Sequence, residues 1–358
     1  MNSDCLKLAV YFGESDRVHG RLLSDELVDL FERYELPAAV LMRAVEGFGI
    51  KQKLRTDRFL TLSEDLPLVA LAVDARAQIE ALLPEVSALV AGGLITVERA
   101  RLLQGPIGRQ ELPDDLHEAM KLTLFLGRDE RVNSRPAYLA VVEHLHAHGL
   151  AGATVLLGVD GMMHGRRQRA RFFSRNASVP LVVIGVGSSE TINAALEGLG
   201  GVVAHPIATL ERVRVCKRDG VLLAQPHHLP QQDDSGLAVW QKLIVYAVEQ
   251  ARHDGHPLYI QLIRRLREEG ASGATALRGI WGFSGDHPPH GDQLFRLHRR
   301  VPTLTTIVDT PDEIQRWFRI IDELTDEAGL VTSEMVPAYL AIAPPDRVGG
   351  LELSRLRF

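Results

Sequence analysis

This chain has few cysteines, a negative net charge and no long apolar runs. Its two cysteines, Cys5 and Cys216, belong to no CxxC pattern, which argues against a disulfide framework or a structural zinc site. A formal charge of -6 over 358 residues argues against a protein that coats nucleic acid. No apolar run reaches the roughly 18 residues of a spanning helix, and residues 1–5 lack the basic and apolar stretches of a signal peptide. We expect a cytoplasmic protein with no nucleic-acid partner.

Sequence signatures of catalysis are missing as well. The chain contains no GxSxG nucleophile elbow, no Walker phosphate loop and no HExxH zinc motif. The segment 185–190 has the wrong glycine spacing for a phosphate loop, and Ser188 or Ser189 is expected to cap the helix that follows. We predict that the protein is not an enzyme and requires no cofactor.

What the chain does have is one unit repeated three times. Lysines that open apolar runs set the register, and between residues 121–163 and 242–284 there are 13 identities in 43 gap-free positions. A unit of this length is a whole domain rather than a solenoid repeat. Matching positions in the three copies are Lys7, Lys121 and Lys242, Ala39, Ala153 and Ala274, and Gly47, Gly161 and Gly282. We predict domains at 5–103, 117–216 and 238–343, linkers at 104–116 and 217–237, and a C-terminal tail at 344–358.

Hydrophobic periodicity predicts the same element order in each copy. In the first copy, strands are expected at 6–12, 38–45, 66–73 and 94–102, with helices at 22–34 and 78–90. In the third copy, Thr310 and Glu313 form a capping box at the start of the second helix. The order βαββαβ is that of a ferredoxin-like α+β domain. The third strands are continuously apolar, so both faces of the sheet should be buried, which predicts three domains packed as an intramolecular pseudo-trimer.

Several short motifs resemble one family of proteins. They are 270–283 (GASGATALRGIWGF), 46–49 (EGFG), 62–67 (LSEDLP), the opening Gly13-Glu14-x-Asp16-Arg17 and the strand end Val73-Asp74. Together they resemble the PII-like family called domain of unknown function 190, in all three copies. The second copy departs from the pattern, because Met162-Met163 replaces the Phe-Gly step and Gly187 replaces the aspartate.

The resemblance implies a fold and a function. PII proteins are trimers of ferredoxin-like subunits that bind small effectors, often adenine nucleotides, in clefts between subunits. A long loop after the second strand contacts the target. The resemblance thus implies a signalling protein, acting as a monomeric pseudo-trimer, with a small anionic effector and with loops 49–60, 163–175 and 284–296 facing a partner. Relatives are associated with fluoride-exporting channels, so a membrane transporter or channel is a candidate partner. The lysine of the PII phosphate turn is not present in this chain.

Candidate effector-binding residues fall into four groups. They are the repeated arginines Arg17, Arg131 and Arg252 with the strand-end arginines Arg43 and Arg278; the Gly-Phe steps Gly47, Phe48, Gly49, Gly282 and Phe283; the turn glycines Gly92, Gly93, Gly200 and Gly201; and the basic loop residues Arg166, Arg167 and Arg169. Each group has a structural alternative. The glycines suit helix C-caps, the basic loop suits a solvated surface, and Arg17 and its equivalents suit ion pairs between repeats with carboxylates such as Asp16 or Glu130.

The alternative function is that of a metal-binding or scaffolding protein. In the third copy, His287 and His290 lie between Asp286 and Asp292, a mixture of residue types that can ligate zinc or copper. The surrounding prolines and glycines are typical of a loop, and the spacing matches no known ligand pattern. A metal site at His287 and His290 therefore stays open beside the effector hypothesis.

Overall fold

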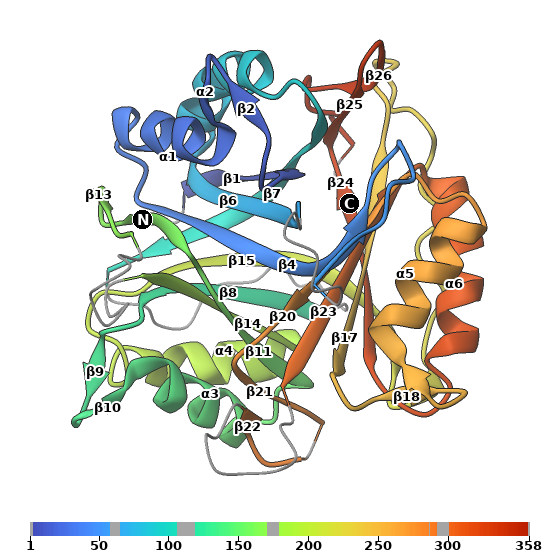
Figure 1. Ribbon diagram of the computed structural model, residues 1–358. Helices are drawn as coiled ribbons and strands as arrows, with labels where there is room; N and C mark the ends of the chain where they lie inside the picture. The colour runs from blue at the N-terminus through green and yellow to red at the C-terminus, as the bar shows by residue number, and fades with distance from the viewer. Residues whose placement is uncertain are drawn as a thin grey trace.

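The computed structural model describes residues 3–57, 65–105, 119–169, 179–285, 287–291 and 301–356. This part is a mixed α+β fold dominated by β-sheet, with the three helix pairs on three different sides of the molecule (Figure 1). None of its helices is long and apolar enough to cross a membrane. The six α-helices are α1 (Leu23–Arg33), α2 (Arg76–Leu89), α3 (Ala137–Ala147), α4 (Ser189–Leu199), α5 (Leu258–Glu268) and α6 (Pro311–Leu324).

The first repeat has the predicted element order. Its main strands are β1 (Ser3–Gly13), β4 (Ala38–Phe48), β6 (Pro67–Ala75) and β7 (Gly93–Gln104), and each predicted boundary lies within three residues of the observed one. Strand β1 is central, because it pairs antiparallel with both β6 and β7, and β6 also pairs with β4. A short hairpin that sequence periodicity did not indicate, β2 (Arg17–Val18) with β3 (Arg21–Leu22), precedes α1.

The second and third repeats follow the same plan with a divided second strand. Repeat 2 contains β8 (Ala119–Gly127), β11 (Gly152–Leu157), β12 (Asp160–Met163), β14 (Pro180–Gly187) and β15 (Ile207–Arg218). Repeat 3 contains β17 (Trp240–Val248), β20 (Ala274–Arg278), β21 (Trp281–Ser284), β23 (Pro302–Asp309) and β24 (Leu330–Val336). Beyond β24, residues predicted as the end of repeat 3 and the tail form a hairpin of β25 (Ala338–Ala343) and β26 (Asp346–Gly350).

Each repeat pairs with the other two through its second strand. The end of β4 pairs with β20 of repeat 3, β12 of repeat 2 pairs with the start of β4, and β21 of repeat 3 pairs with β11 of repeat 2. Figure 1 shows β4 crossing the centre of the molecule toward the strands of repeat 3. The contact is close: a Cβ added to Gly47, Gly161 or Gly282 would lie 2.8, 2.1 or 2.2 Å from the carbonyl oxygen of Ala274, Ala39 or Ala153. The repeated glycines and alanines therefore mark the contacts between repeats.

The fourth strands close a second cycle. The end of β7 pairs with the start of β15, and the end of β15 pairs with the start of β24. The third contact is made by β25, which pairs with the start of β7. Strand pairing thus joins repeat 1 to repeat 2, repeat 2 to repeat 3, and repeat 3 back to repeat 1.

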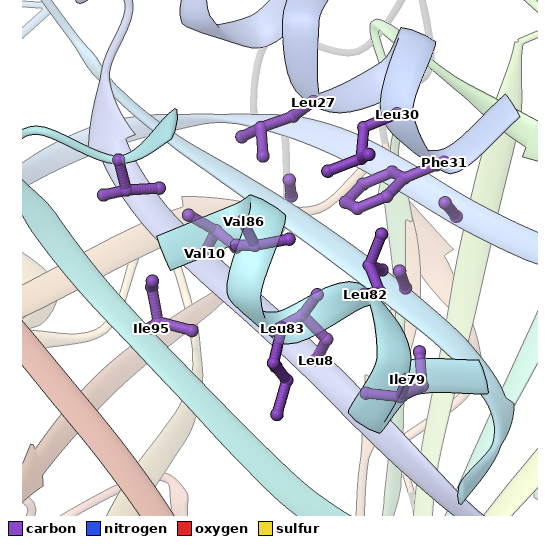
Figure 2. Packing of buried hydrophobic residues seen from close by; sticks show 14 of the residues in the cluster. Leu8, Val10, Leu27, Leu30, Phe31, Ile79, Leu82, Leu83, Val86 and Ile95 are labelled. Carbon is purple, nitrogen blue, oxygen red and sulfur yellow. The ribbon is translucent and has the colours of Figure 1, made fainter. Parts of the chain in front are cut away.

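The core has a helix-facing layer in each repeat and a shared layer between repeats. In repeat 1, Leu27, Leu30 and Phe31 of α1 pack with α2 residues and with Leu8 and Val10 of β1 (Figure 2). On the other face of the sheet, Val69 and Leu71 of β6 pack in one cluster with residues of repeats 2 and 3. Both faces of β6 are buried, as its continuous apolar sequence predicted.

Two predicted helix caps are also present. The Ser188 hydroxyl accepts a hydrogen bond from the Thr191 amide at 3.1 Å, at the start of α4. The Thr310 hydroxyl accepts one from the Glu313 amide at 3.5 Å, at the start of α6. These bonds satisfy backbone donors that the first helical turn leaves unpaired.

Candidate functional site

At the centre of the molecule, the three repeated lysines meet three glutamates from the fourth strands. We call this group the axial ring; its members are Lys7, Lys121, Lys242, Glu98, Glu211 and Glu334, and all six are buried. Cross-strand pairing places each lysine beside the glutamate of its own repeat, and each lysine also reaches the glutamate of another repeat. Lysines and glutamates therefore alternate in a closed circuit. The ion pairs are Lys7 with Glu98 (2.9 Å) and Glu211, Lys121 with Glu211 (3.0 Å) and Glu334, and Lys242 with Glu334 (2.9 Å) and Glu98 (2.6 Å).

The charged forms of Glu98 and Lys7 are favoured within the axial ring, whereas burial lowers the pKa of Lys121 below the ordinary lysine value. Burial alone would raise the pKa of Glu98, but Lys242 and Lys7 together lower it well below the usual range of a glutamate. Burial would likewise lower the pKa of Lys7, and Glu211 and Glu98 raise it well above the ordinary lysine value. The three glutamates are also the group of His, Cys, Asp and Glu side chains in the described residues that is close enough to hold a metal ion. Because every one of them already bonds two lysines, we assign the ring to structure.

A cleft of about 260 Å³ lies between repeats 1 and 3, and we call it the open cleft. It lies where the end of β4 pairs with β20, and the predicted residues Phe48, Gly49, Gly92 and Gly93 line it together. An added Cβ at Gly93, whose φ is +136°, would lie 2.2 Å from the carbonyl oxygen of Tyr11. Glycine is therefore required for the close approach at this turn.

One side of the open cleft is basic. Lys51 and Lys53 are exposed, and Arg55 lies on the short strand β5 (Arg55–Thr56), which pairs with the end of β4. Arg55 forms an ion pair with Asp65 at 2.9 Å, and its guanidinium lies directly over Gly13, where a Cβ would come within 2.3 Å of Nη1. Three cations next to glycine-lined backbone form a suitable environment for a phosphate or carboxylate.

Another part of the open cleft is apolar and aromatic. Tyr339 of β25 lines it and stacks on Trp240 with ring centroids 3.9 Å apart. Ala341 and Ile342 continue this wall, and burial raises the pKa of Tyr339 to about 12, so the phenol is neutral at physiological pH. The lining of the cleft thus combines an apolar, aromatic part with a cationic part, and the acidic side chain of Asp16 also belongs to it.

The equivalent position between repeats 3 and 2, which we call the narrow cleft, has a volume of only about 20 Å³. Val248 occupies the position of Gly13, and His290 of β22 (His290–Gly291) occupies the position of Arg55. In the sequence, Asp286 and Pro288 stand where repeat 1 has Lys51 and Lys53. Among the described residues, the narrow cleft therefore has neither the space nor the lysines and arginine of the open cleft.

The junction between repeats 2 and 1 holds two of the predicted arginines. Arg167 of β13 (Arg166–Arg167) forms ion pairs with Asp160 at 2.7 Å, with Asp25 at 3.4 Å and with Asp29. Arg169 adds a contact to Asp25 at 3.0 Å. These arginines join repeat 2 to α1 of repeat 1, a role that neither the effector nor the solvated-loop hypothesis included. Arg166 is exposed.

The remaining predicted residues lie elsewhere. Arg17, Arg131 and Arg252 are exposed on the short hairpins before the first helices; Arg17 and Arg252 donate to the carbonyls of Gly20 and Glu249. Arg43 bonds Glu14 at 2.7 Å within repeat 1, and its equivalent Arg278 bonds Glu249 at 2.6 Å within repeat 3 and also pairs with Asp57 of repeat 1 at 3.6 Å. Gly200 is the C-cap of α4, with Gly201 next to it.

In the loop of repeat 3, His290 bonds the carbonyl of Pro288. Several predicted segments lie outside the described residues: the loop residues 58–60, 170–175, 286 and 292–296, and most of the linker 104–116.

Sequence reasoning missed three parts of this site. It used the lysines only to set the register and did not notice the glutamates, although a glutamate recurs in all three apolar fourth strands. It did not include Lys51, Lys53 or Arg55 among the candidate binding residues. It gave no signal for the wall formed by β25.

The architecture is a threefold repeat of one α+β unit, and its relatives share that unit. The sequence profile of domain of unknown function 190, described as "Uncharacterized ACR", matches the chain at residues 5–102, 119–215 and 240–338. The chain therefore belongs to this family and carries three copies of its domain.

Two curated relatives are about the size of one repeat. A UPF0166 protein of Aquifex aeolicus is 31% identical over 99 residues, which make up 27% of this chain and 92% of the relative. A UPF0166 protein of Methanocaldococcus jannaschii is 30% identical over 89 residues, which make up 25% of this chain and 82% of the relative. These names assign no activity.

Proposed function

We propose that the chain is a PII-like regulatory protein built as a ferredoxin-like pseudo-trimer. The cyclic pairing of second strands, the cyclic pairing of fourth strands and the axial ring support a threefold arrangement. Relatives of single-repeat size support it too, because three separate copies of such a domain can assemble as these three linked ones do.

The proposed effector is a small anion with a flat apolar part, and an adenine nucleotide is the candidate. The observation that carries this proposal is the open cleft. Its volume of about 260 Å³ suits a small metabolite, and Lys51, Lys53 and Arg55 lie on one side of it. A phosphate would pair with these cations and with amides near Gly92 and Gly93, while a ring would lie against the wall around Ala341 and Ile342.

Effector binding would reach a partner through Arg55. In the described structure Arg55 pairs with Asp65, and the same segment is joined to repeat 3 by a hydrogen bond from Gln52 to the Ala271 carbonyl at 2.6 Å. A phosphate competing for Arg55 would shift the balance of conformations of loop 49–60, and with it the affinity for a partner. We propose a non-enzymatic cytoplasmic sensor whose partner is a membrane transporter or channel.

The test is isothermal titration calorimetry of the full chain with AMP, ADP, ATP and cyclic di-AMP, with and without magnesium. We expect micromolar binding of one nucleotide at a single site per chain, and binding about tenfold weaker in Arg55→Ala. The control is Arg166→Ala, since Arg166 is exposed in repeat 2. If none of the four binds, the nucleotide proposal fails; three equal sites would contradict the assignment to the open cleft.

The metal-binding alternative gains nothing from the described residues. His290 Nδ1 donates to the carbonyl of Pro288 in its own loop, and neither His290 nor His287 belongs to the group of described side chains close enough to hold an ion. We therefore propose only the regulatory function.

A further inference from the structure

A second cavity is lined by residues that follow the ring glutamates along β7, β15 and β24. We call it the axial funnel; its volume is about 1680 Å³, and Glu211 and Glu334 of the ring form part of its floor. This volume exceeds the roughly 300–1,000 Å³ of pockets that enclose one small molecule. The funnel is thus large enough to accept a segment of polypeptide.

Arginine dominates the charged lining of the axial funnel. Arg99 and Arg101 alternate along β7, and Arg212 and Arg214 occupy the matching positions of β15, because both pairs follow a glutamate of the ring. Repeat 3 has Met335 and Pro337 at these positions, so the strand arginines line the funnel on the sides of repeats 1 and 2 but not on the side of repeat 3. Lining acids offset part of this charge: Arg76 pairs with Glu80 at 2.8 Å and with Asp4 at 3.7 Å, and Glu352 also lines the funnel.

Three arginines at the funnel are available to a ligand. Arg212, Arg347 and Arg355 are exposed, and none of them forms an ion pair with another described residue; Arg347 donates only to the Ser87 hydroxyl. Arg99 is committed to the chain itself, through bonds to the carbonyls of Leu356 at 3.0 Å and of Ser354. Exposed guanidinium groups suit carboxylates in fork geometry.

The rim of the funnel also offers an open strand edge. Strand β26 is exposed along its whole length and, within the described part of the chain, pairs only with β25. Arg347, Gly349 and Gly350 of this strand line the funnel, next to the apolar side chains of Leu351 and Leu353. An unpaired edge beside apolar and basic side chains favours an extended chain that adds a strand and alternates acidic and apolar residues.

We propose that the axial funnel is a docking site for an extended acidic segment of a partner protein. The segment pairs its backbone with β26, places carboxylates against Arg212, Arg347 and Arg355, and places apolar side chains against Leu351 and Leu353. The site goes beyond the effector cleft and the loops after the second strands, and it does not depend on either of them.

The test uses fluorescence anisotropy with a short labelled peptide of alternating glutamate and valine. We expect saturable binding to the full chain that weakens as salt increases, and a loss of about tenfold or more in affinity for Arg212→Ala/Arg355→Ala. The matched control is Arg33→Ala/Arg135→Ala, which removes two exposed arginines whose ion pairs with Glu85 and Glu143 lie on the outer surface. Arg212→Lys/Arg355→Lys should recover part of the affinity.

A second probe tests the strand pairing without altering the protein. The same peptide with N-methylated amides cannot form a β-ladder and should bind at least about tenfold more weakly. Equal affinity of parent and Arg212→Ala/Arg355→Ala would overturn the proposal, as would the absence of binding. Displacement by tripolyphosphate together with no effect of N-methylation would also overturn it, since the funnel would then be a site for small anions. No nucleotide is present in this titration, so its failure is separate from a failure of the effector proposal.

Discussion

The open cleft and the narrow cleft are built around the same positions of the repeat, yet the open cleft has a volume of about 260 Å³ and the narrow cleft one of about 20 Å³. The backbone pairing around both is the same, because Gly47 faces Arg55 as Gly282 faces His290. Two side chains differ at matching positions, Gly13 against Val248 and Arg55 against His290, and β25 adds a wall to the open cleft that has no counterpart in the described lining of the narrow cleft. A duplicated fold can therefore keep its frame in every copy while substitutions and an added strand distinguish the clefts.

Breaking the common frame should affect both clefts alike. In Lys7→Met, Glu98 and Glu211 keep one buried lysine partner each, and we expect a loss of about 3–5 kcal/mol in the free energy of unfolding. Urea denaturation measures it. The control is Arg33→Ala, which removes an exposed pair with Glu85 and should cost less than about 1 kcal/mol. Equal effects of the two variants would mean that the ring contributes little.

The same ring predicts a pH dependence. The folded pKa of Glu98 lies below its ordinary value of 4.5, so its contribution is present above that pH and is lost as the pH falls toward the folded value. The folded pKa of Lys7 lies above 10.5, so its contribution is present below that pH and is lost as the pH rises through the folded value. Stability measured by urea denaturation should be highest between these limits. In Lys7→Met the decline on the alkaline side should become smaller.

Closing the open cleft should abolish the difference between the two sites. Gly13→Val introduces the side chain that repeat 3 has at this position, and its Cβ would occupy the space of the Arg55 guanidinium. We expect nucleotide affinity to fall about 100-fold, measured by calorimetry, because both volume and the cation are displaced. The control is Val18→Ala, on the hairpin before α1, which should leave nucleotide affinity unchanged. Gly20→Val on the same hairpin has open space around its Cβ position but is unsuitable as a control, because the φ of Gly20 is +81°.

A variant that removes a cation of the open cleft without reducing the volume of the cleft separates the effect of charge from that of space. Arg55→Ala should weaken nucleotide binding by about tenfold, in line with the loss of one charge-assisted bond to phosphate. The salt dependence of binding should decrease together with the affinity. A variant that binds as well as the parent would show that Arg55 serves only its pair with Asp65.

Opening the narrow cleft should produce the smallest effect. Val248→Gly creates space, but without a cation we expect no second nucleotide site and only a loss of about 1–2 kcal/mol in stability. Val248→Gly/His290→Arg restores both differences and should give weak binding at a second site in calorimetry. If Val248→Gly alone acquires the site, volume rather than charge controls the selection.

The sequence predicted the elements of the fold well because they depend on local patterns. Periodicity located α1 and β6, and hydroxyl residues located the caps at Ser188 and Thr310. It missed the hairpin before α1 and the strands β25 and β26, since short strands depend on tertiary pairing more than on local preference.

The site was only partly predictable, because its properties depend on distant residues. Phe48, Gly49, Gly92 and Gly93, four of the candidate effector-binding residues, all line the open cleft, and their binding role stays a prediction. The sequence could not show that Arg167 pairs with Asp25 and Asp29 more than 130 residues away, or that Val248 fills its cleft. A buried lysine in an apolar strand does indicate a buried acid nearby, and the recurring glutamate was the signal available.

The covalent connections of the chain add a consequence to the position of the open cleft. Linkers join repeat 1 to repeat 2 and repeat 2 to repeat 3, whereas repeats 3 and 1 are held together only by non-covalent contacts, among them the pairing of β25 with β7. The cleft with room for a ligand lies at this third junction. A molecule bound there would contact repeats 1 and 3, the first and last domains of the chain. It would connect them non-covalently, whereas peptide linkers connect the other two pairs of repeats covalently. A ligand of the open cleft would therefore add to the contacts that hold repeats 3 and 1 together and would stabilise the closed arrangement.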